Sequence, residues 1–318
     1  MRGDVGSTSF VLDPLPTSDV RAGIPLLGSV TPILGSVRIF PGQEPVDIRT
    51  ILIDFIDAPL SVDSLLVYDG DRRSLGRATL DTGVPGGRRF MLKLLGNTFV
   101  IPKREERSVY VRAFLKKRDA GGSSGEMFQV KQFRVEGDGM WSNDPYGKTL
   151  AETFPTFQAT RARFTSIANA DTPTGIIPLG PSQRIAAFRF TGERSDLAAE
   201  LRVTDLTFQL SASADLSFAN AVLRGWDAEG GHACTIGSVT ITCSSVPAAH
   251  GIIPDGGRVL ELFADIISTG TVNSPSLQIT LNNPGTVDTA GHISWTDGTT
   301  TFTWVQFEQP VSRGARWR

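Results

Sequence analysis

The sequence predicts an all-β protein built from two tandem β-sandwich domains. Three observations favour this fold class. Apolar and polar residues alternate over many short stretches, clusters of turn residues separate these stretches about every ten residues, and the pattern occurs twice with an offset of roughly 150 residues. Long helices are disfavoured because 33 glycines and 19 prolines are spread along the 318 residues.

Alternation locates the individual strands. Val46–Phe55 is a clear case, because few of its apolar residues follow the spacing of a helix face. The same pattern predicts strands at Ser108–Leu115, Met127–Val135, Ile185–Phe190, Val203–Leu210, Val259–Ile267, Ser276–Leu281 and Thr301–Phe307. The one stretch with helical character, Ser195–Leu201, is long enough for one or two turns.

The two copies divide the chain. Ile48–Phe55 aligns with Val203–Leu210, and Val62–Asp69 aligns with Phe218–Gly225. Turn residues cluster at 137–156, where we expect the boundary. The predicted organisation is therefore an extended N-terminal segment at 1–34, a first sandwich at 35–145, and a linker with the second sandwich at 146–318.

The second copy resembles a known class of domain. The strand Thr204–Phe208, a hairpin that carries both cysteines, and the run Ile252–Gly257 leading into Val259–Ile266 resemble tandem immunoglobulin-like modules of bacterial cell-surface and adhesin-like proteins. The resemblance covers residues 185–305 and, more loosely, 35–135. It implies an extracellular location at a cell surface and a role as a spacer, a filament or layer subunit, or an adhesive domain.

The two cysteines, Cys234 and Cys243, favour a local disulfide over a metal site, which needs three or four ligands. The alternative is a pair of buried free thiols. A two-residue turn at Gly237 and Ser238 would leave the cysteines diagonal, at about 7–8 Å, near the limit for a disulfide. A four-residue loop at 237–240 would place them directly opposite, so we predict that loop together with the bond.

Residues 1–34 are too apolar for a solvated tail and too interrupted by Pro, Gly and Ser for a domain. Such a segment has to be covered, either by its own first domain or by the open sheet edge of a neighbouring molecule. We predict the second arrangement, in which the chain is a non-enzymatic structural protein that assembles with copies of itself. The predicted assembly residues are Phe10, Val11, Leu12, Ile24, Leu26, Leu27, Val30, Ile33 and Leu34.

Alternative hypotheses assign a ligand-binding role to the chain. Trp226 and Trp295 are candidate ligand-binding residues of a glycan- or protein-binding adhesin module, although Trp295 on an alternating strand more often packs in a core. Asp69 and Asp71, or Asp227 and Glu229, could supply oxygens to calcium, but neither cluster matches a known calcium loop. We assign no cofactor and no metal ligands.

Enzyme chemistry has little support in the sequence. Gly121–Gly125 matches the nucleophile-elbow pattern, but its flanks lack the strand before and the helix after that this motif needs. The three histidines are not spaced as zinc ligands. We assign no catalytic residue; a role as an accessory domain of a secreted hydrolase is the remaining alternative.

Charge and hydropathy exclude further classes of partner. With 31 Lys and Arg against 33 Asp and Glu, the net charge is −2, which does not favour nucleic acid. No apolar run approaches the 18 or more residues of a membrane helix, so we expect no membrane insertion.

Overall fold

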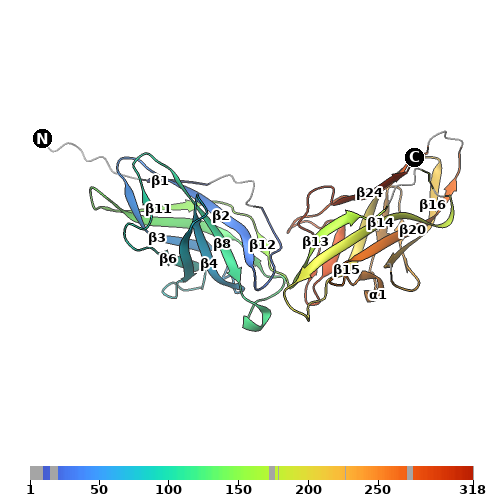
Figure 1. Ribbon diagram of the computed structural model, residues 1–318, viewed down its shortest axis with the longest axis horizontal. Helices are drawn as coiled ribbons and strands as arrows, with labels where there is room; N and C mark the ends of the chain where they lie inside the picture. Colours follow the sequence, from blue (N-terminus) through green and yellow to red (C-terminus); the bar gives the residue numbers. More distant parts are fainter. Residues whose placement is uncertain are drawn as a thin grey trace. The chain divides into compact units, whose positions relative to one another are not determined.

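The computed structural model describes residues 10–14, 21–171, 176–177, 179–225, 227–270 and 275–317. The chain divides into two compact units, Met1–Ala159 and Thr160–Arg318. Nearly all regular structure in the described residues is β, which confirms the predicted fold class (Figure 1).

The first unit is a sandwich of two antiparallel sheets. One sheet has the order β1 (Phe10–Pro14), β2 (Val30–Pro41), β8 (Arg107–Leu115), β4 (Val62–Asp69) and β5 (Ser74–Leu80). The end of β5 also pairs with the other sheet, whose order is β6 (Arg89–Lys93), β3 (Val46–Phe55), β10 (Val130–Gly139) and β11 (Pro145–Ala151). Smaller elements are β7 (Val100–Ile101), the 3₁₀ helix Arg118–Ala120, and the pair β9 (Met127–Phe128) and β12 (Phe157–Gln158). Alternate residues of both sheets fill one core.

The second unit is built in the same way. Its first sheet has the order β13 (Ala162–Asn169), β14 (Gly180–Arg194), β20 (Arg258–Ser268), β16 (Leu216–Gly225) and β17 (His232–Ala233). Its other sheet has the order β18 (Thr235–Ile236), β19 (Thr240–Cys243), β15 (Arg202–Ala212), β21 (Leu277–Leu281) and β24 (Ser312–Trp317). The hairpin of β22 (Ile293–Thr296) and β23 (Thr301–Phe302) adds to β15, and a single helical turn, α1 (Ala248–Gly251), follows β19.

Strand order is the same in the two units. The sequence β1-β2-β8-β4-β5 corresponds to β13-β14-β20-β16-β17, and β6-β3-β10-β11 corresponds to β19-β15-β21-β24. In both, one sheet contains strands in the order A-B-E-D and the other contains strands in the order C-F-G, as in a constant-type immunoglobulin domain, and further strands extend each sheet beyond D and C. The predicted immunoglobulin-like fold is confirmed, and the two units share one strand order.

The unit boundary differs from the one placed by turn residues. Residues 145–151 form β11, which pairs with β10 from Gln132 to Asp138 and so belongs to the first unit. The division between the units comes after Ala159. Turn residues within 137–156 mark the β10–β11 hairpin, because a tight hairpin needs the same residue types as a linker.

Two predicted elements are shorter or absent. Of the strand expected at Thr301–Phe307, only Thr301–Phe302 forms. Beyond it the backbone bonds to other segments, since the Thr303 carbonyl accepts the Gly291 N–H (2.7 Å) and Val305 donates its N–H to the Pro284 carbonyl (2.9 Å). The stretch Ser195–Leu201 is a turn and contains no helix. Its Asp196 accepts the Ala198 backbone N–H (3.0 Å), a local bond that competes with helix formation.

The cysteine pair forms a disulfide, as predicted. Thr235 pairs with Thr242 and Ile236 with Ile241, so the loop spans 237–240 and Cys234 lies opposite Cys243 with 4.3 Å between their Cα atoms. Cys234 sits where the chain leaves β17 in one sheet and enters β18 in the other. The bond therefore fixes a crossing between the two layers of the second unit.

Removing this bond is expected to destabilise the second unit by about 2–3 kcal/mol, since the disulfide restricts the unfolded chain. The paired substitution Cys234→Ser with Cys243→Ser should lower the urea midpoint of that unit. The matched control is wild type with and without a reducing agent. A reduced wild type as stable as the oxidised form would contradict this expectation.

Candidate functional site

The described part of the N-terminal segment belongs to the first unit's own fold. Strand β1 pairs with β2, and Phe10, Leu27 and Leu34 are part of the first unit's core. The Gly23 carbonyl accepts the Gln158 N–H (3.0 Å). Ile24 and Leu26 are also buried, Leu12 and Ile33 are half-buried, and only Val11 and Val30 are exposed. This corrects the expectation of an extended arm, because the apolar residues are already covered within the unit.

The structure does not show a ligand-binding surface formed by the two candidate tryptophans. Trp295 is fully buried, with Phe302 stacked on it at 4.2 Å and Phe164 edge-on at 5.4 Å. Its ring faces are therefore inaccessible to a ligand, which corrects that assignment. Trp226 lies outside the described residues.

The sequence motifs considered for chemistry have structural roles. Asp69 accepts the Arg73 backbone N–H (2.7 Å) in the β4–β5 turn. Ser123 donates its backbone N–H to the Ser61 hydroxyl (2.8 Å), and the segment continues into β9 instead of a helix. Burial lowers the pKa of His250, whose ring accepts the Gly225 N–H (3.3 Å). Among the described residues, no group of three potential ligands could hold a metal ion.

The candidate site is the loop between β10 and β11, residues 140–144, which we call the Trp141 loop. Trp141 is 68 % exposed and its neighbour Met140 is 47 % exposed. Large apolar side chains that stay in water on a folded domain are a mark of interaction surfaces when they lie together. The Trp141 loop corresponds to the F–G loop of the immunoglobulin fold, at an end of the sandwich that often binds partners.

A buried carboxylate holds this loop in place. Glu44, from the β2–β3 connection, is only 4 % exposed. Its two oxygens accept the backbone N–H groups of Trp141 (2.7 Å) and Ser142 (3.0 Å), the Ser142 hydroxyl (2.6 Å) and the Tyr146 hydroxyl (2.9 Å). Four donors on one carboxylate fix the loop backbone directly beneath the exposed indole.

These bonds also set the protonation state of Glu44. Burial raises the pKa of Glu44, but the hydrogen bonds from Ser142, Trp141 and Tyr146 outweigh burial and lower the pKa to about 2. The carboxylate is therefore ionised at any pH at which the protein is expected to work, and the loop keeps its anchor.

The loop backbone adds a second layer of constraint. The Met140 N–H is donated to the Pro45 carbonyl (3.0 Å), and within the loop Asn143 donates to Gly139 (2.9 Å) and Gly139 to Asp144 (3.0 Å). A Cβ at Gly139 would lie 2.4 Å from a Glu44 oxygen, so only glycine lets the carboxylate approach. The close approach of Glu44 thus depends on a residue without a side chain.

The connection between β7 and β8 also contributes a residue to the site. Lys103, in the segment between β7 and β8, places its ammonium 5.2 Å from the centre of the Trp141 ring, a cation–π distance. That segment is itself fixed, since Arg104 donates its backbone N–H to the Pro41 carbonyl (3.1 Å). Three connections that are far apart in sequence therefore meet under one exposed aromatic side chain.

Sequence reasoning did not find this site. Trp141 stands among turn residues, and nothing in one sequence distinguishes an exposed indole from a buried one. Glu44, an acid in a loop between Gly42 and Pro45, is the one residue of the site that the sequence could have pointed to. Its hydrogen-bond partner Trp141 lies about 100 residues further along the chain. Their contact is a product of the β2–β3 and β10–β11 connections meeting at the same end of the sandwich.

No protein-family model and no curated protein matches this chain. It aligns with the solved structure "BspA_C_mut" at 6 % identity, covering 96 % of this chain and 97 % of that chain, with a TM-score of 0.28. The C-terminal domain of the Streptococcus pyogenes antigen I/II-family protein AspA aligns at 8 % identity, covering 98 % of each chain, with a TM-score of 0.28. The "Biofilm associated protein - BSP domain" aligns at 10 % identity, covering 97 % of this chain and 58 % of that chain, with a TM-score of 0.24. TM-scores below 0.5 do not establish a common arrangement of the whole chains.

Proposed function

We propose that this chain is an extracellular, non-enzymatic interaction module that binds a protein partner through the Trp141 loop. The observation that carries the proposal is an exposed indole on a backbone held by a buried, fourfold hydrogen-bonded carboxylate. A loop fixed before binding loses little entropy when a partner arrives, and tryptophan is the residue most enriched among binding hot spots.

The chemistry around Trp141 favours a protein over a glycan. Met140 precedes Trp141 in the loop and is also exposed, and tryptophan and methionine are both enriched at protein interfaces. The Glu44 carboxylate below the loop is buried and its oxygens are occupied by the loop itself, so it does not offer a free acceptor to a sugar.

The disulfide supports an extracellular location, because such bonds persist in oxidising compartments. No helix in the described part of the chain is long and apolar enough to cross a membrane.

Replacing the exposed indole tests the proposal. Fluorescently labelled full chain, applied to an array of extracellular protein domains and to a glycan array, should give saturable signals on the protein array. Trp141→Ala should weaken those signals about tenfold or more, the usual loss at a hot spot. Leu197→Ala is the matched control, since Leu197 is 100 % exposed and lies in the second unit.

Three outcomes would contradict the proposal. These are protein signals that Trp141→Ala leaves unchanged, signals on the glycan array alone, and no saturable signal on either array. The circular dichroism of Trp141→Ala should match wild type, because the side chain makes little contact with the core.

Self-assembly is the second candidate. Terminal strands β1, β11, β13 and β24 each have one paired neighbour among the described residues, so their outer edges could accept a strand. These edges are the candidates for such a contact, because most of the described apolar residues of the N-terminal segment pack within the first unit. Light scattering of the full chain over a range of concentrations separates the two candidates, because edge pairing raises the mass of the wild type and of Trp141→Ala alike.

A further inference from the structure

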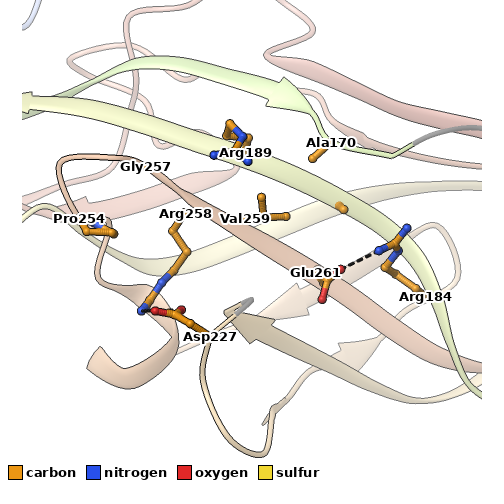
Figure 2. A pocket seen from close by; sticks show the side chains of 10 residues that line it. Ala170, Arg184, Arg189, Asp227, Pro254, Gly257, Arg258, Val259 and Glu261 are labelled. Atoms are coloured by element: carbon orange, nitrogen blue, oxygen red, sulfur yellow. Dashed lines mark hydrogen bonds and ion pairs between the residues drawn. The ribbon is translucent and has the colours of Figure 1, made fainter.

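A groove of about 430 Å³ runs along the outer face of the second unit, over β14 and β20. It lies in a different unit from the Trp141 loop and is independent of the function proposed above. Figure 2 shows the residues that line it, with Arg189 over the strands, Arg184 and Glu261 towards one end, and Arg258 and Asp227 towards the other. A groove of this volume falls within the size range of small-molecule sites.

The floor of the groove is apolar. Ala187 and Val259 project from neighbouring strands, with Pro254 and Ala170 beside them. In the β14–β20 ladder, Arg189 pairs with Val259 and Ala187 with Glu261. Paired residues share a face of a sheet, so Ala187, Arg189, Val259 and Glu261 look out to the same side.

Four of the five charged groups already form ion pairs. Arg184 donates to Glu261 at 2.8 Å, and Arg258 lies 2.8 Å from an oxygen of Asp227. Arg189 is exposed and makes no hydrogen bond or ion pair with another described residue. Figure 2 shows its guanidinium without a contact to the other residues drawn.

The charge of the groove is opposite to that of its unit. Residues 160–318 contain 11 Lys and Arg against 14 Asp and Glu, a net charge of −3. The groove is lined by three arginines against Asp227 and Glu261, a net charge of +1. A local positive site with one unpaired guanidinium on an otherwise negative unit favours an anionic ligand.

We infer that this groove binds a sugar carboxylate, with Arg189 as the residue that recognises the acid. A planar guanidinium matches a carboxylate with two parallel hydrogen bonds. The exposed Asp227 carboxylate can accept sugar hydroxyls, the Arg184 guanidinium can donate to them, and the C–H face of the ring can lie on Val259 and Pro254. A ligand with one acid and several hydroxyls uses all of these features, whereas a simple inorganic anion uses Arg189 alone.

Calorimetric titration of the full chain tests this inference with three probes. Trigalacturonic acid and 3′-sialyllactose both carry the carboxylate and differ in its source, and maltotriose is the uncharged control. Saturable binding of at least one acidic probe, and no binding of maltotriose, is the expected result. Arg189→Ala should lower the affinity for the acidic probe about tenfold or more, and Arg189→Lys should recover part of that loss of affinity.

Arg316→Ala provides the matched control, because Arg316 is an exposed arginine on β24, a strand of the other sheet of the same unit. The affinity of Arg316→Ala for the acidic probe should equal that of wild type. The inference is overturned if maltotriose binds as well as the acids, if Arg189→Ala and Arg316→Ala behave alike, or if no acidic probe gives a saturable signal at about 10 mM, a concentration well above weak affinities.

Discussion

Trp295→Ala is expected to destabilise the second unit by about 3–5 kcal/mol, the usual cost of removing a fully buried aromatic side chain. Trp295 is stacked on Phe302, meets Phe164 edge-on, and donates its indole N–H to the Trp304 carbonyl. Alanine would leave a cavity among these rings and remove the hydrogen bond to the Trp304 carbonyl. Since a loss of this size is a large part of a domain's total stability, the unit could unfold at 37 °C.

Calorimetry of the full chain measures this effect unit by unit. The transition lowered by Trp295→Ala should be the one that also responds to reduction of the Cys234–Cys243 disulfide, because both lie in the second unit. Trp295→Phe should cost less, as it keeps most of the ring contacts. A variant in which both transitions move equally, or in which neither moves, would contradict separate cores.

Glu44→Gln is expected to destabilise the first unit by about 2 kcal/mol at neutral pH, because the amide offers one acceptor oxygen where the carboxylate has two. It also places donor hydrogens against the N–H groups of the Trp141 loop. The folded pKa of Glu44 is about 2 and its ordinary value is 4.5. The stability that ionised Glu44 contributes is therefore fully present above about pH 4.5 and is lost as the pH falls towards 2.

The measurement is the free energy of unfolding of wild type and Glu44→Gln between pH 6 and pH 2, followed by urea denaturation. The difference between the two proteins should shrink as the pH falls through this window. Other carboxylates, such as Asp54 paired with Arg89, titrate in both proteins and cancel in the difference. A difference that stays constant with pH would show that Glu44 is not an ionised anchor.

The alternation of apolar and polar residues predicted the architecture well, because a strand with one buried face and one solvated face alternates between these residue types. β3, β8, β15 and β20 lie where the pattern places them. The disulfide register was also predictable, since it depends on residues within a few positions of one another.

The anchors of the loops were not predictable in the same way. Glu44 and Asp297 are acids in polar, turn-rich segments, where ionised side chains are usually solvated. Both are buried, and Asp297 accepts the Arg161 N–H (2.8 Å) from a residue far away in sequence. Their environments are created by the packing of distant connections, which a single sequence does not display.

The N-terminal segment shows a related limit. The composition of residues 1–34 indicates that their apolar side chains have to be buried. It does not indicate whether the chain's own first unit or a neighbouring molecule buries them. The deciding contacts, between β1 and β2 and between Gly23 and Gln158, join parts of the chain that have no local signal for each other.

The direction of the terminal strands in the first unit has a mechanical consequence. Phe10 at the start of β1 pairs with Pro41, at the end where the β2–β3 connection lies, and Ala151 at the end of β11 pairs with Gln132, at the opposite end. A force that pulls Phe10 and Ala151 apart is therefore directed along the strands. The β1–β2 and β10–β11 hydrogen bonds would have to shear together instead of opening one after another, which is the geometry that best resists tension.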